Sequence, residues 1–220
     1  MTIKVNEIFY SIQGESSYAG RPCIFIRLAG CNLRCSYCDT TYAYDEGEEK
    51  TVAGVLKEIQ KFQCVLVEVT GGEPLLQAET PVLINGLLQQ GYRVLLETNG
   101  SIDIRKVSDQ CVRIVDFKCP SSGMAHASNL KNVDYLSEQD EVKFVIGNRE
   151  DFNYSRDFVG LMEKRKKKRG SKVNSLIHFA PVLGKLEPRK LAEWILEENL
   201  CVHLQLQLHK IIWPTITRGV

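Results

Sequence analysis

Residues 24–40 read IFIRLAGCNLRCSYCDT, an apolar run followed at once by three cysteines. The run Ile24–Leu28 is typical of a strand covered on both faces of a parallel sheet. Cys31, Cys35 and Cys38 follow it with the spacing C-x3-C-x2-C. Loops after parallel strands commonly carry ligands, so this segment predicts both a fold class and the place of a site.

The cysteine spacing indicates a soft metal centre rather than disulfide bonds. The chain opens without an apolar leader, so we expect its eight thiols to stay reduced. Three thiolates suit an iron–sulfur cube whose fourth iron is open to a chelating ligand. A closed zinc site takes four ligands, would have to borrow a distant one, and remains an alternative. The other five cysteines are expected to be buried small hydrophobes, namely Cys23, Cys64, Cys111, Cys119 and Cys201.

Apolar runs alternate with helical patterns along the rest of the chain. Strands are predicted at Ile24–Leu28, Val65–Val69, Arg93–Glu97, Val112–Phe117, Glu141–Ile146, Ser175–Phe179 and Val202–Gln207. Helices are predicted at Val52–Lys61, Thr80–Gln90, Phe152–Lys168 and Arg189–Glu198, and a long loop at Ser121–Val133. This alternation predicts one α/β domain over residues 1–220, a partial, modified (βα) barrel with a mostly parallel sheet, because the chain is short for eight full units.

Polar, glycine-rich segments follow four of these strands. The cysteine loop follows the first, and TGGEP (70–74), TNGS (98–101) and KCPSS (118–122) follow the next three. The carboxyl ends of parallel strands share one edge of a sheet, so we expect these segments to converge on a single site.

Composition excludes several classes of protein. Of 220 residues, 44% are hydrophobic and 25% are charged, which excludes a disordered chain. The 28 basic and 27 acidic residues give a net charge of +1, which argues against direct nucleic-acid binding. No apolar run is long enough to span a membrane, and we expect a cytoplasmic protein. The basic run at residues 164–169 predicts a solvated helix end, or a docking patch for an acidic reductase.

The motifs together resemble the radical S-adenosylmethionine (SAM) superfamily. An aromatic residue, Tyr37, precedes the last cysteine, and Gly71–Pro74 (GGEP) begins 33 residues after Cys38. Further segments resemble the 7-carboxy-7-deazaguanine synthase family within it. They are SIQGE (11–15), AGCNLRC (29–35), CDT (38–40), TGGEPLLQ (70–77), ETNGS (97–101) and LQLHK (206–210).

The resemblance implies an enzyme that converts 6-carboxy-5,6,7,8-tetrahydropterin to 7-carboxy-7-deazaguanine in queuosine and deazapurine biosynthesis. It implies a radical SAM barrel fold, a homodimer, and an external electron donor such as flavodoxin. The implied cofactors are a 4Fe-4S cluster, SAM and Mg²⁺. The implied metal ligands are Cys31, Cys35 and Cys38 for the cluster and Thr40 for magnesium. The implied SAM contacts are Tyr37, Cys38, Asp39, Gly72, Asp116, Phe117 and Lys118, and the implied pterin contacts are Ile12, Gln13, Gly14, Arg27 and Thr70.

Two departures from the family pattern bear on these roles. Some members end at a proline soon after the HK segment, whereas here TITRGV follows Pro214. Some members have SPK where this chain has Asp116-Phe117-Lys118, and only the lysine matches. Two alternatives share part of the pattern, namely a glycyl-radical-enzyme activase and a non-catalytic iron–sulfur or zinc module.

Overall fold

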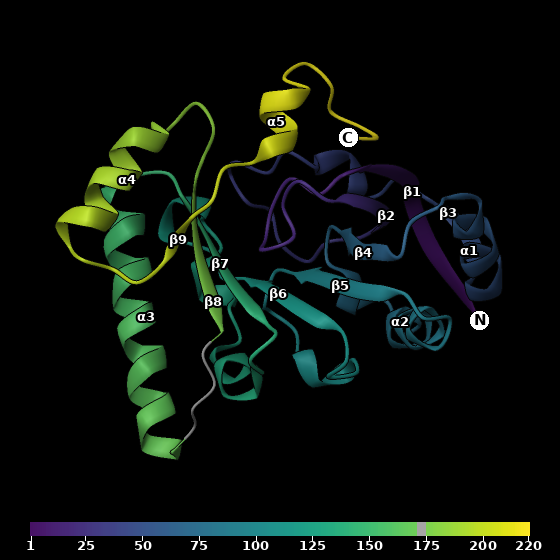
Figure 1. Cartoon of the computed structure of the whole chain (residues 1–220), viewed down its shortest axis with the longest axis horizontal. Coiled ribbons are helices and arrows are strands. Elements are labelled where there is room, and N and C mark those ends of the chain that lie inside the picture. Colours follow the sequence, from purple (N-terminus) through teal and green to yellow (C-terminus); the bar gives the residue numbers. More distant parts are fainter. Residues whose placement is uncertain (171–174) are drawn as a thin grey trace.

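A nine-stranded sheet organises the computed structural model, which describes residues 1–170 and 175–220 apart from the side chains of residues 166 and 169 (Figure 1). The strand order is β3-β1-β2-β4-β5-β6-β7-β8-β9. The strands are β1 (Thr2–Ile12), β2 (Pro22–Leu28), β3 (Glu48–Thr51), β4 (Leu66–Gly71), β5 (Arg93–Thr98), β6 (Val112–Asp116), β7 (Glu141–Ile146), β8 (Leu176–Pro181) and β9 (His203–Leu204).

Every neighbouring pair from β2 to β9 is parallel, while β1 is antiparallel to both β2 and β3. The sheet is open, because β3 and β9 form its two edges among the described residues. The predicted α/β class with a mostly parallel sheet is therefore confirmed.

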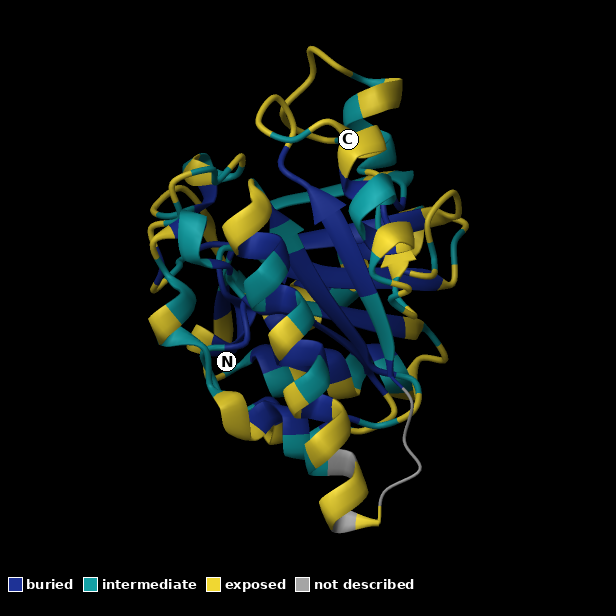
Figure 2. Ribbon diagram, turned by 90° about the vertical axis from the view of Figure 1, so that its left-hand side faces the viewer, coloured by how far each residue is buried: buried dark blue, intermediate teal, exposed yellow. Residues whose placement is uncertain are grey.

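Four helices cover one face of this sheet and share one hydrophobic core with it. They are α1 (Val52–Glu58), α2 (Thr80–Gln89), α3 (Arg149–Arg169) and α4 (Pro188–Glu197). The short α5 (Leu208–Ile212) and the C-terminal tail lie apart from them, on the side of β1 and β2 (Figure 1). In Figure 2 the buried strands are dark blue and the outer sides of the helices are yellow. None of the helices in the described ranges is long and apolar enough to cross a membrane.

The face of the sheet away from these helices is apolar at one end of the strands and polar at the other. Side chains alternate between the two faces along each strand. Cys23, Phe25, Leu66, Leu95, Val112 and Ile114 form a small second apolar cluster on this face. Two residues further along the same strands, the pattern changes to Arg27, Glu68, Glu97 and Asp116. The carboxyl ends of the strands therefore carry the charges.

Several element boundaries differ from the prediction. Strands β1 and β3 were not predicted, β9 is shorter than Val202–Gln207, and α1 ends at Glu58 instead of Lys61. Helix α3 starts at Arg149, earlier than predicted, because the Asn148 side chain accepts a hydrogen bond from the Asp151 backbone and caps the helix. Short 3-10 turns occupy Thr41–Ala43, Ile59–Lys61, Pro74–Leu76, Ile104–Lys106, Pro120–Ser122, Ala125–Ala127 and Leu130–Tyr135, so the predicted loop 121–133 is partly ordered into turns.

Candidate active site

A cavity of about 640 Å³ opens at the carboxyl ends of the parallel strands. Its walls come from the segments that follow β2, β4, β5 and β6, together with the loop after β1, α5 and the C-terminal tail. The predicted convergence of the four polar segments is thus confirmed. All the predicted site residues except Phe117 line this cavity.

The cysteine loop has no regular secondary structure and is held by hydrogen bonds to two other strand ends. Ser36, between two of the cysteines, donates from its backbone to the Ser122 carbonyl (3.0 Å) and from its hydroxyl to the Ser121 carbonyl (2.7 Å). The Tyr37 hydroxyl donates to the Val145 carbonyl at 3.1 Å. Cys31, Cys35 and Cys38 are all free thiols that line the cavity. The loop is therefore fixed in place by the turn after β6 and by the end of strand β7.

Glycines let the end of β4 approach this loop closely. Gly71 has φ +146°, and a Cβ there would lie 2.1 Å from the Leu28 carbonyl oxygen. A Cβ on Gly72 would lie 2.3 Å from the Gly30 carbonyl oxygen and 2.6 Å from the Cβ of Cys31. Real side chains do not tolerate such distances, so only glycine allows the GGEP backbone to pack against the cysteine loop.

Glu73 joins the loops after β4 and β5. Its fully buried carboxylate accepts hydrogen bonds from the Asn99 backbone (2.7 Å), the Leu75 backbone (2.9 Å) and the Thr98 hydroxyl (2.9 Å). Asn99 in turn donates to the side chain of Asn32 at 3.1 Å. The GGEP and ETNGS segments are thus bonded to each other and to the cysteine loop.

The chemistry of the three thiols fits an iron–sulfur group. Burial raises the pKa of Cys31 and Cys35, and the nearby Lys118 ammonium acts in the opposite direction on both. The Leu33 backbone donates to the Cys31 sulfur at 3.4 Å, as backbone amides do to cluster ligands. Within the described ranges, no three His, Cys, Asp or Glu side chains lie close enough to hold a single ion. A cube does not require this, because its thiolates bind different irons.

Thr40 and Asp39 form an oxygen-rich part of the wall beside the thiols. The Thr40 hydroxyl donates to Asp39 Oδ1 at 2.9 Å, and Lys210 Nζ lies 2.5 Å from Asp39 Oδ2. Burial alone would raise the pKa of Asp39, but Lys210 outweighs it and holds that pKa well below its usual range. A hard cation would find a hydroxyl oxygen here, next to a carboxylate that is paired with Lys210.

Arg27 and the SIQGE segment form the wall on the β1–β2 side. Arg27 Nε donates to Glu7 Oε1 at 2.8 Å, and its side chain is 14% exposed. Gln13 donates from its side chain to Glu68, and the Gly14 carbonyl accepts from the Leu208 backbone at 3.0 Å. Ile12 and Thr70 complete this wall. The segment is thus held between β4 and α5.

Phe117 lies elsewhere, while its two neighbours face the cavity. The Phe117 ring is fully buried in the core, 4.7 Å from the Phe158 ring and 6.1 Å from the Phe144 ring. Lys118 Nζ lies 2.8 Å from Asp116 Oδ2. Asp116 Oδ1 is buried and has no hydrogen-bond partner in the described part of the chain. A buried carboxylate oxygen without a partner at a cavity wall indicates that a bound ligand donates a hydrogen bond to it.

A buried lysine, missed by the sequence analysis, organises the acids on the cavity floor. Lys143 forms ion pairs with Glu15 and Glu97, and its Nζ lies 3.8 Å from Asp116 Oδ2. Burial lowers the pKa of Lys143, but these acids outweigh it and raise that pKa well above its usual value. Burial also raises the pKa of Glu15, but Lys143 and His209 reverse the effect and lower it to about 2.

Glu68 is a second missed acid, lying on β4 beside this cluster. It is 3% exposed and has no ion-pair partner among the described residues. Burial, with the negative charges of Glu97 and Glu15, raises its pKa well above the usual value. The sequence does contain a signal by which Lys143 and Glu68 could have been found, namely their positions within apolar strands. Lys143 and Glu68 each interrupt an apolar run in phase with the polar side chains of the neighbouring strands.

The C-terminal segment closes the remaining side of the cavity. Gln207 donates to Glu15 at 2.7 Å, and His209 lies against Gly14. Trp213, Pro214, Ile216, Thr217 and Val220 also line the cavity, so the six-residue tail belongs to the site.

Known proteins are similar to this chain over nearly its whole length. The profile of the Radical SAM superfamily matches residues 25–115. The 7-carboxy-7-deazaguanine synthase of Koribacter versatilis is 42% identical, over 99% of this chain and 100% of the relative. That of Chlorobaculum tepidum is 44% identical, over 99% of this chain and 97% of the relative. The crystal structure of QueE from Escherichia coli has the same fold, with a TM-score of 0.74 at 22% identity and 94% coverage of each chain.

Proposed function

The chain belongs to the 7-carboxy-7-deazaguanine synthase family of the radical SAM superfamily, and from this premise we propose how its cavity works. Its function is that of a radical SAM lyase that makes 7-carboxy-7-deazaguanine for queuosine and deazapurine biosynthesis. The observation that carries this function is the 42% identity to the Koribacter versatilis enzyme over 99% of this chain and 100% of that relative. This identity favours a small pterin substrate over the protein substrate of a glycyl-radical-enzyme activase. It also favours an enzyme over a non-catalytic iron–sulfur or zinc module.

In our proposal Cys31, Cys35 and Cys38 hold the 4Fe-4S cluster. When bound, the cluster and SAM supply the 5′-deoxyadenosyl radical that begins the ring contraction with loss of ammonia. The close packing of Gly72 against the cysteine loop supports this assignment, because a Cβ there would clash with the Gly30 carbonyl oxygen at 2.3 Å and displace the loop.

We assign SAM to the wall formed by Tyr37, Cys38, Asp39, Gly72 and the Asp116–Lys118 segment. The unpartnered Asp116 Oδ1 supports this assignment, because SAM offers amino and ribose hydroxyl donors. Phe117 contributes to this segment through its backbone only, since its ring is in the core. The chain's role here is to orient SAM and exclude water, while the cofactors supply the reactive chemistry.

The pterin contacts in our proposal are Ile12, Gln13, Gly14, Arg27 and Thr70. Arg27 would bind the substrate carboxylate, because a guanidinium presents a planar pair of donors that matches a carboxylate. The acids around Lys143 also line the cavity and offer acceptors to the polar edge of a pterin. The charges of the cavity thus suit a substrate with a carboxylate at one end and ring N–H groups at the other.

Magnesium is assigned to Thr40. Its hydroxyl lies in the cavity wall next to an ionised carboxylate, which fits the preference of magnesium for oxygen ligands. Magnesium usually keeps several waters, so a single protein ligand is enough when the substrate supplies others.

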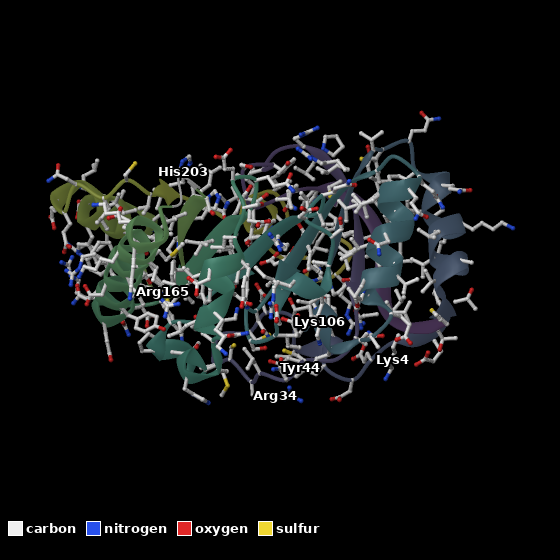
Figure 3. All side chains as sticks on the ribbon, turned by 90° about the horizontal axis from the view of Figure 1, so that it is seen from below. Lys4, Arg34, Tyr44, Lys106, Arg165 and His203 are labelled. Atoms are coloured by element: carbon white, nitrogen blue, oxygen red, sulfur yellow. The ribbon has the colours of Figure 1, made fainter. Side chains whose placement is uncertain are left out.

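We further propose a cytoplasmic homodimer that receives electrons from a protein such as flavodoxin. Apolar side chains of β9, α5 and the tail support self-association, because they are exposed in one chain, namely Leu204, Ile211, Ile212 and Ile216. The exposed positive charge of Arg34 supports docking of an acidic electron-donor protein near the cysteine loop. Arg34 lies exposed on the cysteine loop, with its guanidinium 4.2 Å from the centre of the Tyr44 ring (Figure 3).

Arg27 provides the experiment that tests these assignments. Arg27→Ala removes a charge-assisted contact and should weaken pterin binding by about 1.5–3 kcal/mol. Arg27→Lys keeps the charge but loses the planar fork, so it should resemble Arg27→Ala more than wild type. The affinity of the SAM-loaded enzyme for the carboxypterin measures this directly. An affinity unchanged in Arg27→Ala would remove Arg27 from the substrate site.

A further inference from the structure

Glu7 is a half-buried acid next to the cavity that has no role in the proposed function. It lies on β1 directly opposite Arg27 of β2, and its side chain is 18% exposed. Its Oε1 accepts hydrogen bonds from Arg27 Nε (2.8 Å) and from the Tyr42 hydroxyl (3.0 Å). Its Oε2 accepts from the backbone of Gly219 at 3.2 Å. One carboxylate therefore joins the cavity wall to the end of the chain.

This contact determines which donors of Arg27 remain available. A guanidinium has five N–H donors, and within the described residues Glu7 engages only the Nε edge. The rings of Phe9 and Tyr42, centred 5.7 and 5.9 Å from the Arg27 Cζ, restrict the guanidinium further. Among the residues that the structure describes, the paired Nη groups have no protein acceptor, and Arg27 lines the cavity. This is the edge that binds a carboxylate in a bidentate manner.

The C-terminal tail covers Glu7 and ties the same corner together. The Thr217 carbonyl oxygen lies 3.2 Å from the Tyr42 hydroxyl and shares its single proton with Glu7, and the Arg218 guanidinium lies 4.2 Å from the centre of the Tyr42 ring. Arg218 also pairs with Glu46 at 2.8 Å. In Figure 1 the yellow tail runs from α5 toward β1 and β2. The tail thus covers part of the Glu7 carboxylate, which stays 18% exposed.

We propose that Glu7 is a positioning residue that gives the site its selectivity for carboxylated pterins. It holds the Nε edge of Arg27, with the tail as its cover, so that the Nη pair faces the substrate carboxylate. This proposal rests on the proposed function, in which Arg27 binds that carboxylate. A structural role alone, as a cross-strand ion pair, would stabilise the sheet without affecting the choice between ligands.

The test measures the selectivity of the site rather than its activity. The probes are 6-carboxypterin and pterin, which differ in the carboxylate, and their affinities for the SAM-loaded holoenzyme are read by pterin fluorescence under anaerobic conditions. Wild type should prefer the carboxylated probe. Glu7→Gln should lower this preference about tenfold, with little change in the affinity for pterin. Glu46→Gln is the matched control, because it removes an ion pair of the tail without touching Arg27, and it should leave the preference unchanged.

Two further variants make every outcome decisive. If Arg27→Ala keeps the preference, then Arg27 does not bind the carboxylate, and both this inference and that assignment are wrong. If Arg27→Ala abolishes the preference while Glu7→Gln retains it, only the role of Glu7 is wrong. Tyr42→Phe removes one donor to Glu7 and should lower the preference by a smaller factor, about threefold. It provides the same test if Glu7→Gln does not fold, and an unchanged preference in it would then overturn the proposal.

Discussion

Lys143 offers a stringent test of the electrostatics on the cavity floor. Its side chain is 5% exposed and pairs with Glu15 and Glu97, whose side chains are 13% and 23% exposed. Lys143→Met keeps much of the side-chain volume but removes the only ammonium that contacts both acids in the described chain. The variant therefore leaves two half-buried carboxylates without their counter-charge.

Two estimates give the expected loss in the free energy of unfolding. Removing one partner of a buried ion pair typically costs about 3–5 kcal/mol. The net fall in the pKa of Glu15 from 4.5 to about 2, in which Lys143, His209 and Gln207 together outweigh burial, corresponds to about 3.5 kcal/mol at about 1.4 kcal/mol per pKa unit. We expect Lys143→Met to lower the free energy of unfolding by about 3 kcal/mol at pH 7.

The pH dependence gives this prediction a sign. The pKa of Glu15 is lower in the folded chain than in the unfolded chain, so its stabilisation is present above pH 4.5 and is lost as the pH falls toward 2. The difference between wild type and Lys143→Met should therefore narrow from pH 7 to pH 3, as measured by urea unfolding under reducing conditions. Lys50→Met is the control, because Lys50 and Glu58 form a similar pair that is about 30% exposed and should contribute less than about 1 kcal/mol. A difference below about 1 kcal/mol for Lys143→Met, or one that does not change with pH, would refute this reasoning.

Three other predictions address the thiols, the cation and the second buried acid. Cys35→Ala should lose iron and SAM cleavage while the exposed Cys201→Ala retains both, and full iron content in Cys35→Ala would remove it from the cluster. Thr40→Val should reduce the stimulation of turnover by magnesium and leave the iron–sulfur spectrum intact, whereas coincident magnesium titrations would leave Thr40 without a metal role. Burial, Glu97 and Glu15 raise the folded-state pKa of Glu68, so wild type loses stability as the pH rises through that value. The stability of Glu68→Gln relative to wild type should therefore increase from pH 5 to pH 9 in urea unfolding, and a constant difference would contradict the raised pKa.

The sequence predicts the parallel half of the sheet well, because those strands are continuous apolar runs. Strand β1 was missed because its side chains are mostly half-buried and polar residues such as Asn6 and Glu7 interrupt it. Strand β3 has the sequence EEKT and owes its conformation to backbone pairing with β1, which no side-chain pattern reveals. Strand β9 is short because its two exposed residues pair only with the edge of β8.

The same reasoning explains what could be predicted of the site. Motif residues such as Cys31 and Gly72 stand out because their chemistry or their lack of a side chain is required at a fixed spacing. Lys143 and the tail do not stand out in the sequence, because their roles depend on distant contacts. Lys143 contacts Glu15, 128 residues away, and the tail contacts Glu7, 212 residues away. Local patterns cannot predict such pairs without the register of the sheet.

Product formation tests the central claim most directly. The reconstituted chain would be incubated anaerobically with SAM, a reductant and 6-carboxy-5,6,7,8-tetrahydropterin, and the mixture would be analysed by mass spectrometry. Our account predicts 7-carboxy-7-deazaguanine, formed only when all three are present and lost in Cys35→Ala. Cleavage of SAM without any product derived from the pterin would contradict it.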